Sequence, residues 1–440
     1  MSTATRDANE AWPIGKRQMV TAIIASSLGW SLDLFDLFIL LYVAPVIGKL
    51  FFPSDYPTLS LAAVYASFAV TLLMRPFGSA LFGSYADRYG RRGTMIVAVI
   101  GVGISTALFG ALPTIAQVGA VAPVIFLVMR LVQGLFVGGV VASTHTIGTE
   151  SVPPYWRGAM SGLVGGGGAG IGALLASLAY FATTEIFPGD AYAVWGWRCM
   201  FFSGIISSIL GFFIFNRLEE SPIWASLNAK RGAGGVVRAP VRAVFSREYL
   251  PVLLVNLMMT VGGGAGYYLT SGYLPTFLKV VSKTSSETTS FILIAGSLLA
   301  IAASITAGHC STLFGRKKVL LGLALIRIVV LPLCFLGLAG TQSVGVIAAY
   351  AMILTFFGNA GYAPLLIFLN ERFPTALRAS GTGLSWNIGF AIGGLMPTFV
   401  SLAAGSTQNL PYTLAIFVFG ISVLFLIGAL VIPETRGNLK

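Results

Sequence analysis

The sequence has few charged residues and few residues that commonly bind metals. Asp, Glu, Lys and Arg make up 10% of its 440 residues, whereas an average soluble chain contains roughly 25%. Hydrophobic residues account for 56%. The two histidines and three cysteines indicate neither a metal site nor a disulfide framework, because the cysteines lack paired spacing. We therefore expect a polytopic membrane protein that uses no metal or cofactor, and not a soluble enzyme.

Long apolar runs recur along the chain, and a run of roughly 20 apolar residues is long enough to span a bilayer as a helix. The runs predict twelve spans near 19–48, 60–86, 94–113, 118–146, 158–183, 199–216, 250–278, 289–312, 319–339, 343–369, 379–403 and 411–432. The predicted fold is all-α. It has six transmembrane helices in 1–216, a linker loop at 217–249 and six more helices in 250–440.

The basic residues predict how the chain is oriented. Twenty Lys and Arg residues fall in the termini and in loops on the same side as the termini, and four fall in the opposite loops. Because cytoplasmic loops carry an excess of Lys and Arg, we expect both termini and the middle loop to face the cytoplasm. The location is then the plasma membrane, which is the inner membrane in a bacterium. Nucleic-acid binding is not expected, because it needs basic residues gathered on one folded face.

The two halves of the chain contain matching motifs. Residues 150–157 (ESVPPYWR) follow the fourth predicted span and residues 371–378 (ERFPTALR) follow the tenth, and both read E-x-x-P-x-x-x-R. Residues 83–92 (GSYADRYGRR) after the second span are echoed by 308–317 (GHCSTLFGRK) after the eighth. The matches predict two pseudo-symmetric six-helix bundles. Such duplication is typical of transporters, which bind their substrate between the two repeats.

The loop motif G-x-x-x-D-R-x-G-R-R at 83–92 resembles the signature loop of the major facilitator superfamily. Arg130-x-x-Gln133-Gly134 and the segments 219–222 and 433–437 resemble other motifs of that family. The resemblance implies alternating access by rocking of one bundle against the other. It also implies a gate at the cytoplasmic end, formed by Gly83, Asp87, Arg88, Gly90, Arg91, Glu150, Arg157, Glu371 and Arg378.

Within that family, Arg75-Pro-Phe-Gly78 and the segment 371–381 are similar to the metabolite–proton and the sialate/lactate–proton symporters. This similarity implies proton-coupled uptake of a small organic acid anion, with a monocarboxylate such as lactate or pyruvate as the first prediction. Carriage of a dicarboxylate, a sialic or aromatic acid or a zwitterionic osmolyte stays open, and a membrane receptor that does not transport is a more distant alternative. The expected partners are the substrate, protons and lipid, and the carrier is expected to work as a monomer.

Ionisable residues inside the predicted spans are candidates for function, because each costs roughly 2.5–3.5 kcal/mol to insert. Asp33 and Asp36 are three residues apart and share a helix face. At about 1.5 Å per residue, Asp33 and Arg75 lie at similar depths in their spans. We expect Asp33, Asp36 and Arg75 to couple transport to protons, and the alternative is that the aspartates only neutralise Arg75.

Two further arginines lie within spans. Arg130 and Arg327 are predicted to bind an anionic substrate, although Arg130 can instead be a coupling partner of the aspartates and either residue can simply pack between helices. The polar and aromatic residues that are also predicted to bind substrate are Asn256, Tyr267, Tyr268, Asn359, Tyr362, Trp386 and Asn387.

Overall fold

The computed structural model describes residues 15–89, 91–216, 240–374 and 378–438. Side chains are described except at 80, 83–89, 91–92, 94–95, 141–143, 145–147, 150, 214–216, 240–241 and 378–380. The described part of the chain is helical and contains no β-strand. A helix satisfies its own backbone hydrogen bonds, which the hydrocarbon of a bilayer cannot do. The all-α prediction is thus confirmed.

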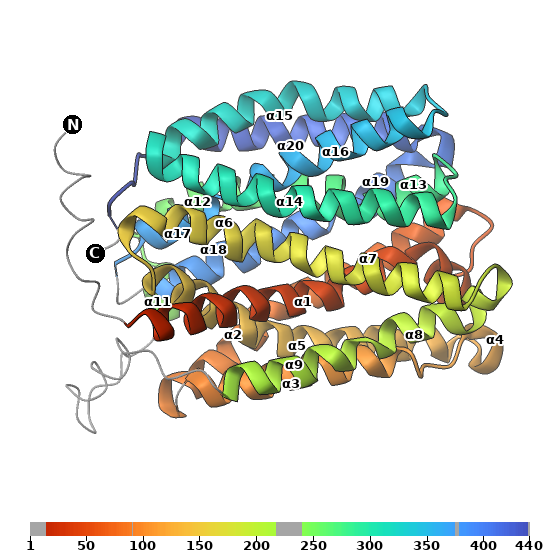
Figure 1. The fold of residues 1–440 in the computed structure, drawn as a ribbon, viewed down its shortest axis with the longest axis horizontal. Coiled ribbons are helices and arrows are strands. Elements are labelled where there is room, and N and C mark those ends of the chain that lie inside the picture. Colours follow the sequence, from red (N-terminus) through yellow and green to blue (C-terminus); the bar gives the residue numbers. More distant parts are fainter. Residues whose placement is uncertain (1–14, 90, 217–239, 375–377, 439–440) are drawn as a thin grey trace.

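The helices lie side by side along the long axis of the molecule (Figure 1). The first group, here called the N-terminal set, comprises α1 (Lys16–Phe51), α2 (Pro57–Tyr89), α3 (Arg91–Phe109), α4 (Ile115–Val118), α5 (Val121–Glu150), α6 (Arg157–Gly162), α7 (Gly168–Ile186), α8 (Trp197–Phe202) and α9 (Gly204–Asn216). The second group, the C-terminal set, comprises α11 (Pro240–Val244), α12 (Leu250–Tyr267), α13 (Leu274–Val280), α14 (Ser286–Phe314), α15 (Arg316–Ala339), α16 (Val344–Ala360), α17 (Leu365–Arg372), α18 (Arg378–Gly394), α19 (Met396–Ala404) and α20 (Leu410–Val431).

Each of the twelve predicted spans coincides with one helix or with two helices in succession. Eleven helical segments of the described residues are long and apolar enough to cross a membrane. Several of these segments join two labelled helices, as Val344–Arg372 joins α16 to α17. α3 begins three residues before the predicted third span and ends at Phe109, four residues before that span's predicted end. α1 begins and α20 ends at one end of the molecule (Figure 1), called here the termini end, and the opposite end is called the distal end.

Several predicted spans are interrupted rather than continuous. A π-helical turn, Leu163–Gly167, joins α6 to α7, and another, Tyr268–Gly272, follows α12. A turn at 361–364 separates α16 from α17. Glycine and proline occupy these places, and both weaken the regular hydrogen-bond ladder of a helix. The interruptions lie within the spans, where the sequence predicted unbroken helices.

The same helix pairings occur in both sets. In the N-terminal set α1 packs on α7 and α9, α2 packs on α5, and α3 packs on α5 and α9. In the C-terminal set α12 packs on α18 and α20, α14 packs on α16, and α15 packs on α16 and α20. These are equivalent pairs when the six spans of each set are counted in order. The motif repeats in the sequence therefore correspond to a repeated packing arrangement.

The sets meet along two seams, α14 against α6 and α7, and α2 against α18 and α19. Glycine permits the first seam, because a Cβ at Gly308 would lie 3.0 Å from the Cα of Gly162. A Cβ at Gly162 would in turn lie 3.1 Å from the Cα of Ile305. Small residues let transmembrane helices approach this closely.

Glu371, which was predicted to contribute to the gate, forms a buried ion pair inside the C-terminal set. Its carboxylate accepts two hydrogen bonds from the Arg316 guanidinium, each 3.1 Å long. The Thr435 hydroxyl donates a third bond to it, at 2.8 Å. The Glu434 carboxylate accepts from the backbone N–H of Arg316 at 2.8 Å. Three sequence motifs, at 308–317, 371–378 and 433–437, thus meet at the termini end.

We predict that Glu371→Gln lowers the melting temperature of the detergent-solubilised protein by several degrees. Removing one partner of a buried ion pair leaves the other charge uncompensated and costs about 3–5 kcal/mol. Glu287→Gln, at an exposed site in the first turn of α14, serves as the matched control. Equal thermal unfolding curves for the two variants would show that the pair does not stabilise the fold.

Candidate functional site

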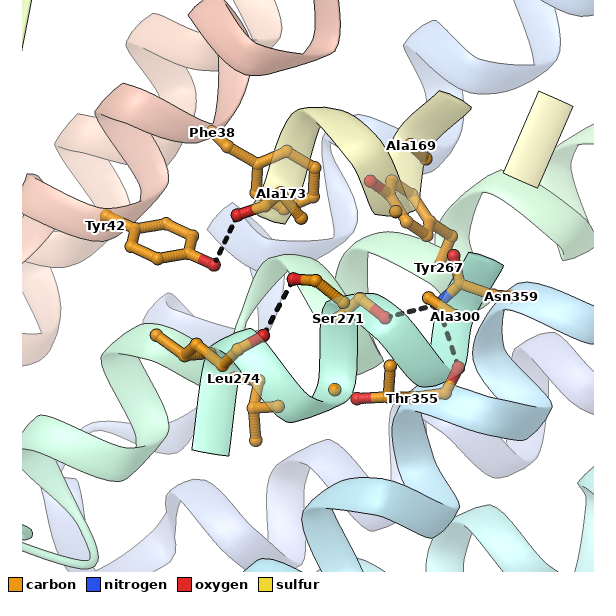
Figure 2. Close-up of a pocket in the computed structure, with 14 residues that line it drawn as sticks. Phe38, Tyr42, Ala169, Ala173, Tyr267, Ser271, Leu274, Ala300, Thr355 and Asn359 are labelled. Carbon is orange, nitrogen blue, oxygen red and sulfur yellow. Dashed lines mark hydrogen bonds between the residues drawn. The ribbon is translucent and has the colours of Figure 1, made fainter. Parts of the chain in front are cut away.

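A small cavity lies between the two sets of helices (Figure 2). Helices α1, α7, α12, α13, α14 and α16 contribute to its wall, together with the π-helical turn after α12. The lining residues are Phe38, Tyr42, Ala169, Gly170, Ala173, Tyr267, Ser271, Leu274, Leu293, Gly296, Ser297, Ala300, Thr355 and Asn359. About 20 Å³ is open to the centres of water molecules. That space holds one or two water molecules, so the volume of the cavity is too small for an organic substrate.

Hydroxyl and amide groups supply the polar part of the lining. The Asn359 amide donates to the Ser271 hydroxyl at 2.9 Å and to the Thr355 carbonyl at 2.8 Å (Figure 2). On the opposite wall the Tyr42 hydroxyl lies 2.7 Å from the Ser177 hydroxyl. The lining therefore offers uncharged hydrogen-bond donors and acceptors, and none of the lining residues carries a formal charge.

Aromatic rings surround the cavity. The Tyr267 ring contacts Phe38 at 6.2 Å and Tyr362 at 5.1 Å between centroids. Beyond Tyr362, the Trp386 and Phe390 rings stack at 4.3 Å. Most of these contacts are edge-to-face, which leaves negative ring faces available to a positively charged group.

Hydrogen bonds and ring contacts cross the interface between the two sets toward both of its ends. Toward the termini end, the Ser161 hydroxyl donates to the Ala363 carbonyl and accepts from the Ile367 N–H, both at 3.0 Å. Toward the distal end, the Tyr65 hydroxyl donates to the Thr276 hydroxyl at 2.8 Å, and the Tyr65 and Tyr273 rings stack at 5.0 Å. The two helix sets are thus in contact toward both ends of the molecule.

The three residues predicted to couple protons are buried and do not line this cavity. Arg75 Nη1 lies 3.6 Å from Asp33 Oδ2, and the pair lies within electrostatic range of Tyr268. Within the described residues neither carboxylate oxygen of Asp33 accepts a hydrogen bond. Asp36 instead faces α9, where the Ser207 hydroxyl donates to it at 3.1 Å. The two aspartates therefore have different partners.

Arg130 does not line the cavity. Its guanidinium lies 4.2 Å from the Phe109 ring centroid and 5.1 Å from that of Phe126. Its Nη1 donates to the Gln133 side chain at 2.7 Å, and Gln133 donates to the Thr106 hydroxyl at 2.6 Å. Thr106 in turn lies within hydrogen-bonding reach of Asp36. This geometry favours the alternative in which Arg130 is connected to a span-one aspartate.

Arg327 is buried between helices of the C-terminal set. Its guanidinium lies 4.8 Å from the Phe425 ring centroid, and Nη2 lies 3.4 Å from the Gly262 carbonyl. Glycines provide the space, because a Cβ at Gly266 would collide with Nη2 and one at Gly361 would lie 2.6 Å from Nη1. Within the described part of the chain, Nε and Nη1 have no hydrogen-bond partner.

Of the predicted binding residues, Tyr267 and Asn359 line the cavity, and Tyr268, Tyr362 and Trp386 belong to the aromatic residues around it. Besides the two arginines, Asn256 and Asn387 are the predicted binding residues that neither line the cavity nor belong to those aromatic residues. Asn256 bonds to Ser385 and Arg372. Asn387 donates to Ser79 across the α2–α18 seam at 3.4 Å.

Most of the predicted gate cannot be placed. Arg157 begins α6, at the seam with α14. Gly90 lies outside the described residues. Only the backbone is described for Gly83, Asp87, Arg88, Arg91, Glu150 and Arg378. Sequence reasoning did not select Phe38, Tyr42, Ser271 or Thr355, although all four line the cavity. The spacing of Phe38 and Tyr42, four residues apart, was the available signal for a shared helix face.

A sequence profile of the Major Facilitator Superfamily matches residues 19–384. The chain belongs to the major facilitator superfamily. It is thus a multi-pass membrane transporter, as the motifs of the two halves indicated. The fold agrees with that of another major facilitator protein, the xylose transporter XylE of Escherichia coli in a partially occluded inward-open form. The TM-score is 0.70 at 18% identity, covering 96% of this chain and 99% of the other.

Curated relatives within the superfamily include the proline/betaine transporter of Escherichia coli K12. It is 29% identical over 424 residues, which cover 95% of this chain and 84% of the relative. A glycine betaine/proline/ectoine/pipecolic acid transporter of Dickeya dadantii is 28% identical over the same length, with the same coverage.

We predict that Gly266→Ala destabilises this major facilitator protein, because the new methyl group would displace the Arg327 guanidinium. Overpacking of a buried site costs about 1–3 kcal/mol. Gly420→Ala in α20 is the control, since nothing lies within 4 Å of a Cβ there. Thermal unfolding of the purified variants is the measurement. Identical curves for both variants would show that the position of Arg327 is not fixed by Gly266.

Proposed function

We propose that the protein is a proton-coupled symporter of a small zwitterionic osmolyte, such as proline or a betaine, in the bacterial inner membrane with both termini in the cytoplasm. The observation that carries the proposal is the lining of the cavity, which is aromatic and polar without a formal charge. The names of the relatives point to the same class of substrate. This class was an alternative in the sequence analysis, which favoured a monocarboxylate.

The physical argument concerns how each end of a zwitterion is held. A quaternary or secondary ammonium is attracted to aromatic faces, and Phe38, Tyr42 and Tyr267 present rings to the cavity. The carboxylate has the Ser271 hydroxyl as a donor, because that hydroxyl accepts from the Asn359 amide and keeps its own proton. A monocarboxylate is a net anion and would need a cation in the lining. The two arginines predicted for that role, Arg130 and Arg327, pack inside their own helix sets.

Proton coupling is proposed to use the aspartates of α1. The Asp33–Arg75 ion pair is buried beside the aromatic residues, and Arg130 donates to Gln133, which donates to Thr106 near Asp36. A proton that neutralises one carboxylate weakens such contacts and permits the helix sets to change their packing. The carrier then acts as a monomer by alternating access between the two sets.

We predict that proteoliposomes with an imposed inward proton gradient accumulate labelled proline or glycine betaine, and that a protonophore abolishes the accumulation. A gradient of two pH units sustains up to about a hundredfold accumulation if one proton accompanies each substrate molecule. Labelled lactate, measured in parallel, is the competing substrate. Uphill uptake of lactate without uptake of either zwitterion would overturn the proposed substrate and restore the monocarboxylate prediction.

The double variant Asp33→Asn/Asp36→Asn is expected to lose accumulation driven by the proton gradient, because no α1 carboxylate remains to take up the proton. Exchange of labelled for unlabelled substrate without a gradient tests whether the variant still binds. Asp190→Asn, at an exposed distal site, is the control and should behave as the unmodified protein does. Full uphill uptake by the double variant would exclude both aspartates from coupling.

A further inference from the structure

A row of aromatic rings leads from the cavity toward the distal end. The centroid distances are 6.2 Å from Tyr267 to Phe38, 6.0 Å from Phe38 to Tyr42 and 5.8 Å from Tyr42 to Tyr180. Each step is nearly edge-to-face, with interplanar angles of 87°, 88° and 71°. All four rings are buried. The row therefore connects the cavity to the seam between α7 and α14.

Lys279 stands at the outer end of this row. It lies near the end of α13, and its ammonium lies 5.8 Å from the Tyr180 ring centroid. Its Nζ also donates to the Ser286 hydroxyl at 2.6 Å. Ser286 is the first residue of α14, so its side chain lies at the positive end of that helix dipole. The Tyr192 ring adds a second aromatic surface, 5.8 Å from Tyr180.

Like Arg130 and Arg327, Lys279 is a cation without a carboxylate partner among the residues that the structure describes. Arg75 and Arg316, by contrast, each have a carboxylate partner. Its side chain is half-buried. An ammonium has three donors, and after the bond to Ser286 it can still bind a carboxylate from outside the protein.

We propose that Lys279, Ser286 and Tyr180 form an outer binding site, where a zwitterion is captured before it reaches the cavity. The inference rests on the proposed function. The substrate carboxylate binds the Lys279 ammonium and the Ser286 hydroxyl, and the attached alkylated ammonium lies against the faces of Tyr180 and Tyr192. From there the next ring inward is Tyr42, which lines the cavity. A monocarboxylate can bind Lys279 and Ser286, but it has no ammonium to lie against the tyrosine rings.

The transport test compares Lys279→Gln with Lys283→Gln. Lys283 is an exposed lysine in the connection that follows α13 and leads to α14. Its replacement should leave KM and Vmax unchanged. For labelled glycine betaine, we expect Lys279→Gln to raise KM about threefold to tenfold and to leave Vmax nearly unchanged, because the site acts before translocation. Lys279→Arg keeps the charge and should restore most of the affinity. An unchanged KM, or a loss of Vmax alone, would overturn the outer site.

A second test needs no transport. Lys279 and Lys283 are acylated with an amine-reactive reagent in proteoliposomes, and mass spectrometry follows the rate at each lysine with and without glycine betaine. We expect glycine betaine to slow acylation of Lys279 and not of Lys283. Choline, which has the quaternary ammonium and no carboxylate, should protect far less.

The two measurements separate the two proposals. Protection of Lys279 in a protein that transports no zwitterion would support the outer site and overturn the proposed function. Transport of glycine betaine without protection of Lys279 would support the proposed function and overturn the outer site.

Discussion

The hydrocarbon of a bilayer offers no hydrogen-bond partner, and this constraint explains where the polar groups of the chain lie. The five ionisable residues in the predicted spans are all buried in the bundle and none faces outward. Each solves the problem of burial differently. Asp33 and Arg75 pair with each other, Asp36 accepts from the Ser207 hydroxyl, Arg130 donates to the Gln133 side chain, and Arg327 lies against an aromatic ring. The candidate coupling network is a consequence of this enforced burial.

The interruptions of the helices coincide with the cavity. The π-helical turn Tyr268–Gly272 directly follows Tyr267 and contains Ser271, and both line the cavity. The turn at 361–364 comes two residues after Asn359. A π-helical turn changes the direction of the side chains around it and is frequent at functional sites. The C-terminal set thus builds its wall of the cavity where its helices are least regular.

Three motifs that are far apart in the sequence contact one another at the termini end. The loop motif supplies Arg316, the E-x-x-P-x-x-x-R motif supplies Glu371, and the last motif supplies Thr435 and Glu434. Together they tie the ends of α15, α17 and α20. Glu371 therefore holds the C-terminal set together, and the contacts between the two sets near this end include those of Ser161 with Ala363 and of Asn370 with Thr149.

The sequence by itself determined the number of helices, their order and the repeat of two sets, because these follow from apolar run length and from motif spacing. It also placed Asp33 and Asp36 at a depth where either could pair with Arg75, since depth along two neighbouring spans can be counted, and the structure pairs Asp33 with Arg75. Only the tertiary structure decided which residues face the cavity. A helix that is apolar on every side carries no periodic signal of its orientation, so Phe38 and Tyr42 looked like any other apolar residues of α1. For the same reason, the sequence could not show that Arg130 and Arg327 turn into their own helix sets and leave an uncharged aromatic wall between them.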